Sequence, residues 1–194
     1  EIELPAGLSF GNGKLFVAES GASRITVLDG EGAALWNFSG PGSAPGQLDA
    51  PMGVAFGPDA RLYVSDTGNA RVQVFNSDGI FLYGFPAMKS DNTARFRPAK
   101  IVLDRSGFIY VSDPGLALLQ KYDRTGRLVK EYPLPNDGMA VSDYGVIYAV
   151  NGKEGKVREL DQKGEVVGTF GTRGRGKSEY LKLRDVALDA DGLL

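Results

Sequence analysis

Cysteine and histidine are both missing from the 194 residues of this chain. Without them, disulfides, thiol catalysis, Cys/His zinc sites and haem attachment are excluded, as are Ser-His-Asp and Cys-His catalysis. Only carboxylates, lysine, tyrosine or an oxygen-ligated metal remain as catalytic groups. No stretch approaches 18 consecutive apolar residues, so we predict no membrane span in this segment.

Glycine and proline are plentiful, at 27 and 10 residues, and apolar residues make up 42% of the chain. This composition indicates a globular, turn-rich protein. The net charge of −2 is unevenly divided: residues 1–94 carry 5 Lys and Arg against 10 Asp and Glu, and residues 95–194 carry 17 against 14. A nucleic-acid-binding surface usually needs a denser basic patch than the small excess of Lys and Arg in residues 95–194 provides.

A repeat decides the fold class. The stretch LFVAESG (15–21) recurs as LYVSDTG (62–68), as IYVSDPG (109–115) and, in eroded form, as IYAVNGK (147–153). Each copy lies in a unit of four short apolar segments that alternate with period two and are separated by Gly, Asp, Asn and Ser. Four antiparallel strands in a unit of about 45 residues are typical of a β-propeller blade. Aromatic side chains at the repeating positions are expected to pack between blades.

We therefore predict an all-β fold, a single β-propeller over residues 1–194, with four complete repeats and partial blades at both ends. The repeats are expected at about 5–50, 51–97, 98–135 and 136–182, with a partial repeat at 183–194. In that partial repeat Leu194 takes the place of Leu15, and residues 1–5 resemble the end of an outer strand. Such a piece is expected to be an open arc or a fragment of a longer ring. Since exposed strand edges invite pairing, remaining blades or a second chain would close it.

The second repeat carries a family resemblance. Residues 46–85, GQLDAPMGVAFGPDARLYVSDTGNARVQVFNSDGIFLYGF, resemble an NHL repeat in the Gly-Gln-Leu…Pro entry, the Tyr-Val-x-Asp-x-x-Asn-x-Arg-Val core and the closing hairpin. The resemblance implies a propeller, commonly of six blades in this family, and it does not imply one function. Lyase-type members of the family use histidine metal ligands, which this chain lacks, so that activity is not expected here.

The sequence Asp66-Thr67-Gly68 is also the signature of an aspartic protease, whose mechanism needs two aspartates that share a proton. The equivalent residues of the other repeats lie on separate blades, so a dyad is not expected. We interpret Asp66 with Arg71, and Glu19 with Arg24, as structural turn pairs joined by charge-assisted hydrogen bonds. The third repeat has Leu118 in place of the arginine, so its Asp113 needs another partner or must face solvent.

The loops between blades are the expected binding surface, because variable loops on a rigid scaffold usually carry function. Two basic clusters stand out there, and each contains an aromatic side chain, Tyr180 in one and Phe96 in the other. The candidate binding residues are Arg95, Arg97, Lys100, Arg173, Arg175, Lys177 and Tyr180.

Around the central channel, Gly7, Gly53 and Gly138 are expected to leave space at the starts of the inner strands, while Lys100 and Asp185 place opposite charges there. One carboxylate is too few for a calcium site. We predict no catalytic residue, no metal and no cofactor.

Three functions compete. The leading prediction is a non-enzymatic scaffold that binds a protein or a carbohydrate through its inter-blade loops, in an extracytoplasmic protein. The first alternative is RNA binding, for which affinity would fall steeply with salt. The second is a six-bladed calcium-dependent hydrolase or lactonase, which needs a cluster of carboxylates and amides in the channel.

Overall fold

The computed structural model describes residues 2–91 and 94–189. These residues form sixteen strands, and none of them belongs to a helix that could cross a membrane. The strands in chain order are β1 (Pro5–Gly11), β2 (Lys14–Glu19), β3 (Arg24–Leu28), β4 (Ala34–Phe38), β5 (Gly53–Phe56), β6 (Arg61–Asp66), β7 (Arg71–Asn76), β8 (Phe81–Pro86), β9 (Ile101–Leu103), β10 (Ile109–Asp113), β11 (Leu118–Tyr122), β12 (Leu128–Pro133), β13 (Gly138–Val141), β14 (Ile147–Asn151), β15 (Lys156–Leu160) and β16 (Val166–Phe170).

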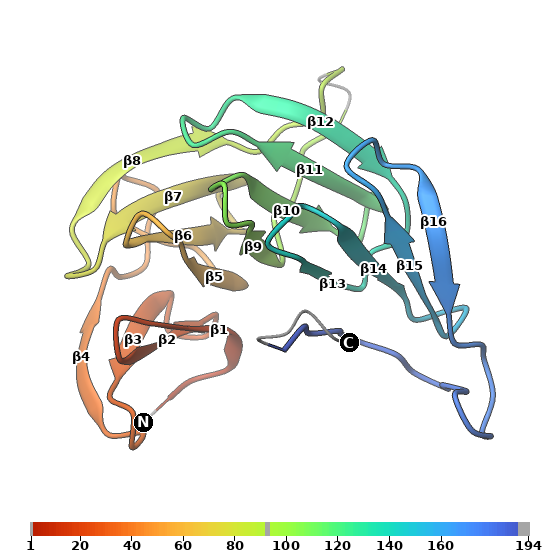
Figure 1. The fold of residues 1–194 in the computed structure, drawn as a ribbon. Helices are drawn as coiled ribbons and strands as arrows, with labels where there is room; N and C mark the ends of the chain where they lie inside the picture. Colours follow the sequence, from red (N-terminus) through yellow and green to blue (C-terminus); the bar gives the residue numbers. More distant parts are fainter. Residues whose placement is uncertain (1, 92–93, 190–194) are drawn as a thin grey trace.

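The strands pair into four antiparallel sheets of four strands, each in sequential order from β1-β2-β3-β4 to β13-β14-β15-β16. Figure 1 shows the sheets arranged around a common centre, with β1, β5, β9 and β13 nearest to it and β4, β8, β12 and β16 at the rim. The predicted all-β propeller fold is therefore confirmed. The blades are numbered 1 to 4 in chain order below.

The hairpin between the third and fourth strands has the same construction in every blade. In blade 2, the Asn76 Oδ1 accepts the backbone N–H groups of Asp78 (3.0 Å) and Ile80 (2.8 Å), and Gly79 has a φ of +84°. Only glycine adopts this left-handed conformation at little cost. The asparagine or aspartate therefore closes the turn, and the glycine permits it. The matching glycines are Gly32, Gly126 and Gly164.

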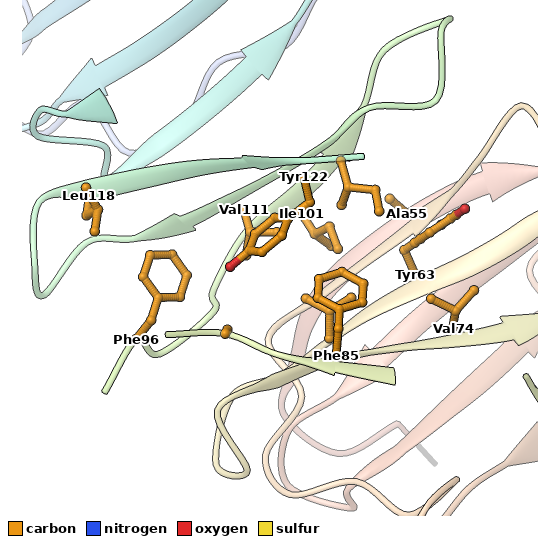
Figure 2. Packing of buried hydrophobic residues seen from close by; sticks show 12 residues of the cluster. Ala55, Tyr63, Val74, Phe85, Phe96, Ile101, Val111, Leu118 and Tyr122 are labelled. Carbon is orange, nitrogen blue, oxygen red and sulfur yellow. The ribbon is translucent and has the colours of Figure 1, made fainter. Parts of the chain in front are cut away.

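The core lies between blades, where the faces of successive sheets pack together. Figure 2 shows the interface of blades 2 and 3, in which Phe85 packs against Tyr122 with ring centroids 5.0 Å apart and ring planes tilted by 47°. Each connecting loop inserts a large apolar side chain into the interface: Leu48, Phe96 and Leu134 in chain order. Each fully buried side chain of this size contributes roughly 1.5–3 kcal/mol, so the inter-blade faces hold the arc together.

Beyond β16, residues 182–189 return toward the centre, as Figure 1 shows in dark blue. They pass beside β13, because a Cβ atom added at Gly138 would lie within 3.0 Å of backbone atoms of Arg184 and Asp185. This is the place that an inner strand of a next blade would take. The rest of the predicted partial repeat, including Leu194, lies outside the described residues.

Candidate functional site

The loops between blades and the turns between second and third strands lie at the same end of the propeller. Arg95 Nη2 donates to the Gly68 carbonyl (3.0 Å), and the Thr67 hydroxyl donates to the Pro98 carbonyl (2.6 Å), so loop and turn meet directly. We call this end the loop face: residues 39–52, 87–91, 94–100, 134–137 and 171–185, with the turns 20–23, 67–70, 114–117 and 152–155. The remaining hairpin turns form the opposite end, which we call the hairpin face.

Asp66, the candidate from the protease signature, is fully buried at the loop face. Its carboxylate accepts hydrogen bonds from Arg71 Nε (2.6 Å), from the Asn69 and Gln73 side-chain amides (3.0 Å each to Oδ2) and from the backbone N–H of Asp49 (2.7 Å). Four donor groups therefore surround this carboxylate, and one of them belongs to the loop from the preceding blade. Asp66 therefore joins successive blades to each other. The sequence did not identify Asn69 and Gln73 as hydrogen-bond donors to this carboxylate.

Blade 1 repeats the arrangement with a longer acid. The buried Glu19 accepts from Arg24 Nε (2.9 Å), from the Thr26 hydroxyl and from the backbone N–H of Glu3 (2.6 Å). In blade 3 there is no arginine, and Asp113 instead accepts the backbone N–H groups of Arg97 (2.6 Å) and Leu116 (3.1 Å). The carboxylate therefore keeps its bond to the incoming loop in all three blades, with or without an arginine.

Glu19 makes stability depend on pH. Burial alone would raise the pKa of its carboxyl. The hydrogen bonds from Arg24, Thr26 and the Glu3 N–H lower the pKa by more than burial raises it, so the net pKa lies below the ordinary value of 4.5. A carboxyl with a lower pKa in the folded state stabilises the fold above its unfolded pKa, and this stability is lost as pH falls through the folded pKa. We expect Glu19→Gln to make the unfolding free energy, measured in urea from pH 6 to pH 3, fall less steeply than in the wild type. Glu165→Gln, an exposed control, keeps the wild-type slope; equal slopes for all three proteins would contradict this role.

The glycines at the channel have a packing role besides the predicted one. A Cβ atom at Gly7, Gly53 or Gly138 would come within 3.0 Å of the carbonyl oxygen of Met52, Ala99 or Arg184, respectively, just before the next inner-strand position. Gly7 and Gly53 also line the cavity in the channel. These glycines therefore let neighbouring inner strands approach backbone to backbone.

Lys100 is the exception among these positions, since it takes the place of the glycine in blade 3. Its Nζ forms an ion pair with the Asp185 carboxylate, which joins blade 3 to the segment that follows blade 4. The predicted opposite charges are thus in direct contact. Asp137 and Arg184 also line this part of the channel, and sequence reasoning missed both. The signal was available, because Asp137 directly precedes β13 and Arg184 stands at the equivalent position of the partial repeat that follows.

The channel holds a cavity of about 1090 Å³. One side is apolar, lined by residues such as Leu8, Met52 and Val54 of blades 1 and 2, and the charged residues named above lie on the other side. Across residues 2–91 and 94–189, no three acidic side chains come together as a metal-binding group.

The predicted binding residues divide into two groups. Arg95, Arg97 and Lys100 lie in the loop between blades 2 and 3, where Arg95 and Arg97 are exposed and Lys100 reaches the cavity. Arg173, Arg175 and Lys177 are exposed on the loop that follows blade 4. Among described residues, the ion pair between Lys100 and Asp185 links the two loops.

The loop that carries Arg173 and Arg175 repeats the conformation of the loop between blades 1 and 2. In residues 42–48, Gln47 Oε1 accepts from the Ala44 N–H, and the Leu48 N–H donates to the Gly40 carbonyl. In residues 174–180, Glu179 Oε2 accepts from the Gly176 N–H, and the Tyr180 N–H donates to the Thr172 carbonyl. These two loops therefore differ in their side chains but share their backbone hydrogen bonds.

This correspondence changes the meaning of Tyr180. Tyr180 takes the position of Leu48, which is fully buried between blades 1 and 2, whereas 43% of Tyr180 is exposed. By position it is therefore an inter-blade packing residue. Phe170 is likewise 45% exposed, although the equivalent Phe38 packs on Phe75 of the next blade.

Comparison with known proteins agrees with this architecture. Residues 48–75 match the NHL repeat, so the predicted resemblance is confirmed over the turn that contains Asp66 and Arg71. No curated protein sequence matches the chain. The protein is thus a β-propeller with an NHL repeat.

Solved structures of low sequence identity share the fold. Virginiamycin B lyase from Staphylococcus aureus has a TM-score of 0.72 at 14% identity, over 97% of this chain and 61% of that one. The Pan2 WD40 domain of Neurospora crassa has a TM-score of 0.70 at 11% identity, over 97% of this chain and 56% of that one. Hydrazine synthase of Kuenenia stuttgartiensis has a TM-score of 0.68 at 17% identity, over 87% and 49%. This chain thus spans between about half and three fifths of these structures, and at such identities the likeness concerns the fold alone.

Proposed function

We propose that this propeller is a non-catalytic scaffold whose loop face binds an acidic protein segment or an anionic carbohydrate. The observation that carries the proposal is the separation of charge between its two ends. The loop face has ten cationic side chains against six carboxylates, a net charge of +4, whereas the turns of the hairpin face have four against nine, a net charge of −5.

The cations of the loop face are concentrated on two loops beside the cavity. Residues 87–100 carry four and residues 171–185 carry five. Within the described ranges, Arg97, Arg173, Arg175 and Lys177 are exposed, and their side chains donate no hydrogen bond to the protein. Arginine binds carboxylate and sulfate groups with two parallel hydrogen bonds, which suits an acidic polypeptide or an acidic sugar. A ligand laid across the cavity mouth would reach both loops at once.

The non-catalytic part of the proposal rests on the chemistry of the side chains. A solved variant of virginiamycin B lyase, with one histidine replaced by alanine, is described as catalytically inactive and holds quinupristin. This chain has no histidine at all, so it cannot carry out a reaction that depends on a histidine side chain. The carboxylates of Glu19, Asp66 and Asp113 are each occupied in holding a loop.

RNA binding is the competing candidate, and its support is weaker because Tyr180 takes a packing position rather than that of a stacking platform. The two candidates differ in the probe that they prefer, because salt weakens the binding of any polyanion to Lys and Arg side chains. An RNA site would favour single-stranded RNA over other polyanions, with an affinity that falls steeply as salt rises.

Charge reversal tests the proposal. We expect Arg173→Glu, Arg175→Glu and Lys177→Glu together to weaken binding of a fluorescent polyglutamate peptide or a heparin hexasaccharide at least tenfold, measured by anisotropy at 50 mM salt. The matched control reverses three cations of the hairpin face, Arg105, Arg127 and Lys163, and keeps the wild-type affinity. Equal losses in both triple variants, or tighter binding of a single-stranded RNA of equal charge, would contradict the proposal.

A further inference from the structure

A second, smaller cavity lies on the loop face, where the connection from blade 2 to blade 3 crosses the turn 67–70. Its volume is about 410 Å³, within the range of roughly 300–1,000 Å³ that is usual for ligand pockets. We call it the loop recess. Both blades that it adjoins are complete, and most of its lining is apolar: Ala70, Pro86, Ala87, Met88 and Ala94.

Contacts within the protein fix the shape of the loop recess. Its floor contains the buried Ala70 and Ala87, which are joined by a hydrogen bond from the Ala87 N–H to the Ala70 carbonyl (3.0 Å). Met88 and Arg95 pair as an isolated antiparallel bridge, which holds the two sides of the loop together. Gln120 Nε2 of blade 3 donates to the Met88 carbonyl (2.8 Å). The loop is therefore anchored to both of the blades that it connects.

The loop recess suits an aliphatic side chain. Met88 is 45% exposed, so apolar surface is open to solvent on a face that otherwise carries many charges. Removing such surface from water favours binding, and the unbranched side chain of methionine adapts to the shape of its neighbours. None of the described lining residues is aromatic.

Arg95 gives the loop recess its charge. Its Nη2 donates to the Gly68 carbonyl (3.0 Å), which fixes the guanidinium group, and within the described ranges its Nε and Nη1 donate to no protein atom. The other polar lining residue is Asn69, whose side-chain amide already donates to the Gly42 carbonyl (2.9 Å) and to Asp66. A carboxylate is therefore the group that this site binds best through charge-assisted hydrogen bonds.

We infer that the loop recess anchors an acidic peptide segment: one aliphatic side chain of the peptide enters the recess, and a neighbouring carboxylate binds Arg95. This inference rests on the proposed function and narrows its ligand to a peptide. A carbohydrate suits the recess less well, because sugar hydroxyls need hydrogen-bond partners that aliphatic side chains do not provide. The exposed Arg97, on the same loop, attracts further carboxylates of the segment.

Two fluorescent peptides of equal charge test the anchor. Both consist of glutamates around one central residue, which is leucine in the first peptide and glycine in the second. We expect the leucine peptide to bind the full chain at least tenfold more tightly in anisotropy measurements, because its side chain leaves water. Ala94→Phe, which fills the recess, should abolish the difference. Ala33→Phe, at an exposed alanine of the hairpin face, should preserve it, and both variants should bind the glycine peptide as the wild type does.

The three methionines report where the peptide binds. With ¹³C-labelled methionine methyl groups, the leucine peptide should shift the NMR signal of Met88. The signals of Met52, which lines the channel cavity, and of Met139, which is buried between blades 3 and 4, should stay in place.

The inference is overturned if the two peptides bind equally or not at all, or if Met52 shifts in place of Met88. It is also overturned if Ala94→Phe weakens the binding of a heparin hexasaccharide as strongly as that of the leucine peptide. Equal binding of the two peptides would leave the proposed function standing, since both peptides are acidic. If neither the peptides nor the hexasaccharide bound, the inference and the proposed function would both fail.

Discussion

Gly53→Ala should destabilise the protein by about 3 kcal/mol, because overpacking against atoms that cannot move aside costs this much. The added Cβ would come within 3.0 Å of the Ala99 carbonyl oxygen, and it would also press on the backbone nitrogen and side chain of Ile101. These contacts involve backbone, so relief requires blades 2 and 3 to separate at the channel. The measurement is the free energy of unfolding from urea denaturation.

The matched control is Gly30→Ala, at a glycine with no atom within 4 Å of the added Cβ. We expect its effect to stay within about 0.5 kcal/mol, as for most surface substitutions. A similar loss of stability in the two variants would show that backbone approach at the inner strands does not limit how closely blades pack.

Arg71→Leu should cost about 3–4 kcal/mol, the range found when one member of a buried ion pair is removed. Asp66 is fully buried, so the change leaves its carboxylate without its charged partner, and three carbonyls of the loop 42–48 lose their donors. Blade 3 has no arginine at this position. Its Asp113 accepts hydrogen bonds from two backbone N–H groups instead, and no loop carbonyls there depend on a guanidinium group, so blade 3 does not contradict the expected loss in blade 2.

Two comparisons sharpen this prediction. Arg127→Leu removes an arginine that is 81% exposed and pairs with Asp123, and such a surface pair is worth at most about 1 kcal/mol. The double variant Asp66→Asn, Arg71→Leu should recover part of the loss, because it removes the uncompensated charge. If Arg71→Leu and Arg127→Leu were equally mild, the turn pair would not fasten the blades.

The blade architecture could be predicted because its signals are local. The period-two alternation of the segments and the recurrence of the stretch 62–68 mark strands and turns directly, and the pairing of Asp66 with Arg71 follows from their spacing at a turn. The ion pair of Lys100 and Asp185 was also within reach, since both residues occupy the same position in different repeats.

Two features could not be predicted from residue types. The recurrence of the loop 42–48 at 174–180 resides in backbone hydrogen bonds, and Ser43-Ala44-Pro45 and Arg175-Gly176-Lys177 share almost no chemistry. In the second loop, Arg173 and Arg175 led to the prediction of a charged binding surface, whereas the structure shows that Tyr180 occupies a packing position. The close backbone approach at the channel glycines could not be predicted for a related reason: it depends on the next inner strand, which is about 45 residues away in the sequence.

Hydrogen–deuterium exchange of the intact chain, with and without a heparin hexasaccharide, tests most directly whether the loop face is the binding surface. The account predicts slower exchange in residues 87–100 and 171–185, with no change in the hairpin-face turns 104–108, 123–127 and 161–165. Protection confined to those hairpin turns, or no protection anywhere at saturating hexasaccharide, would contradict it.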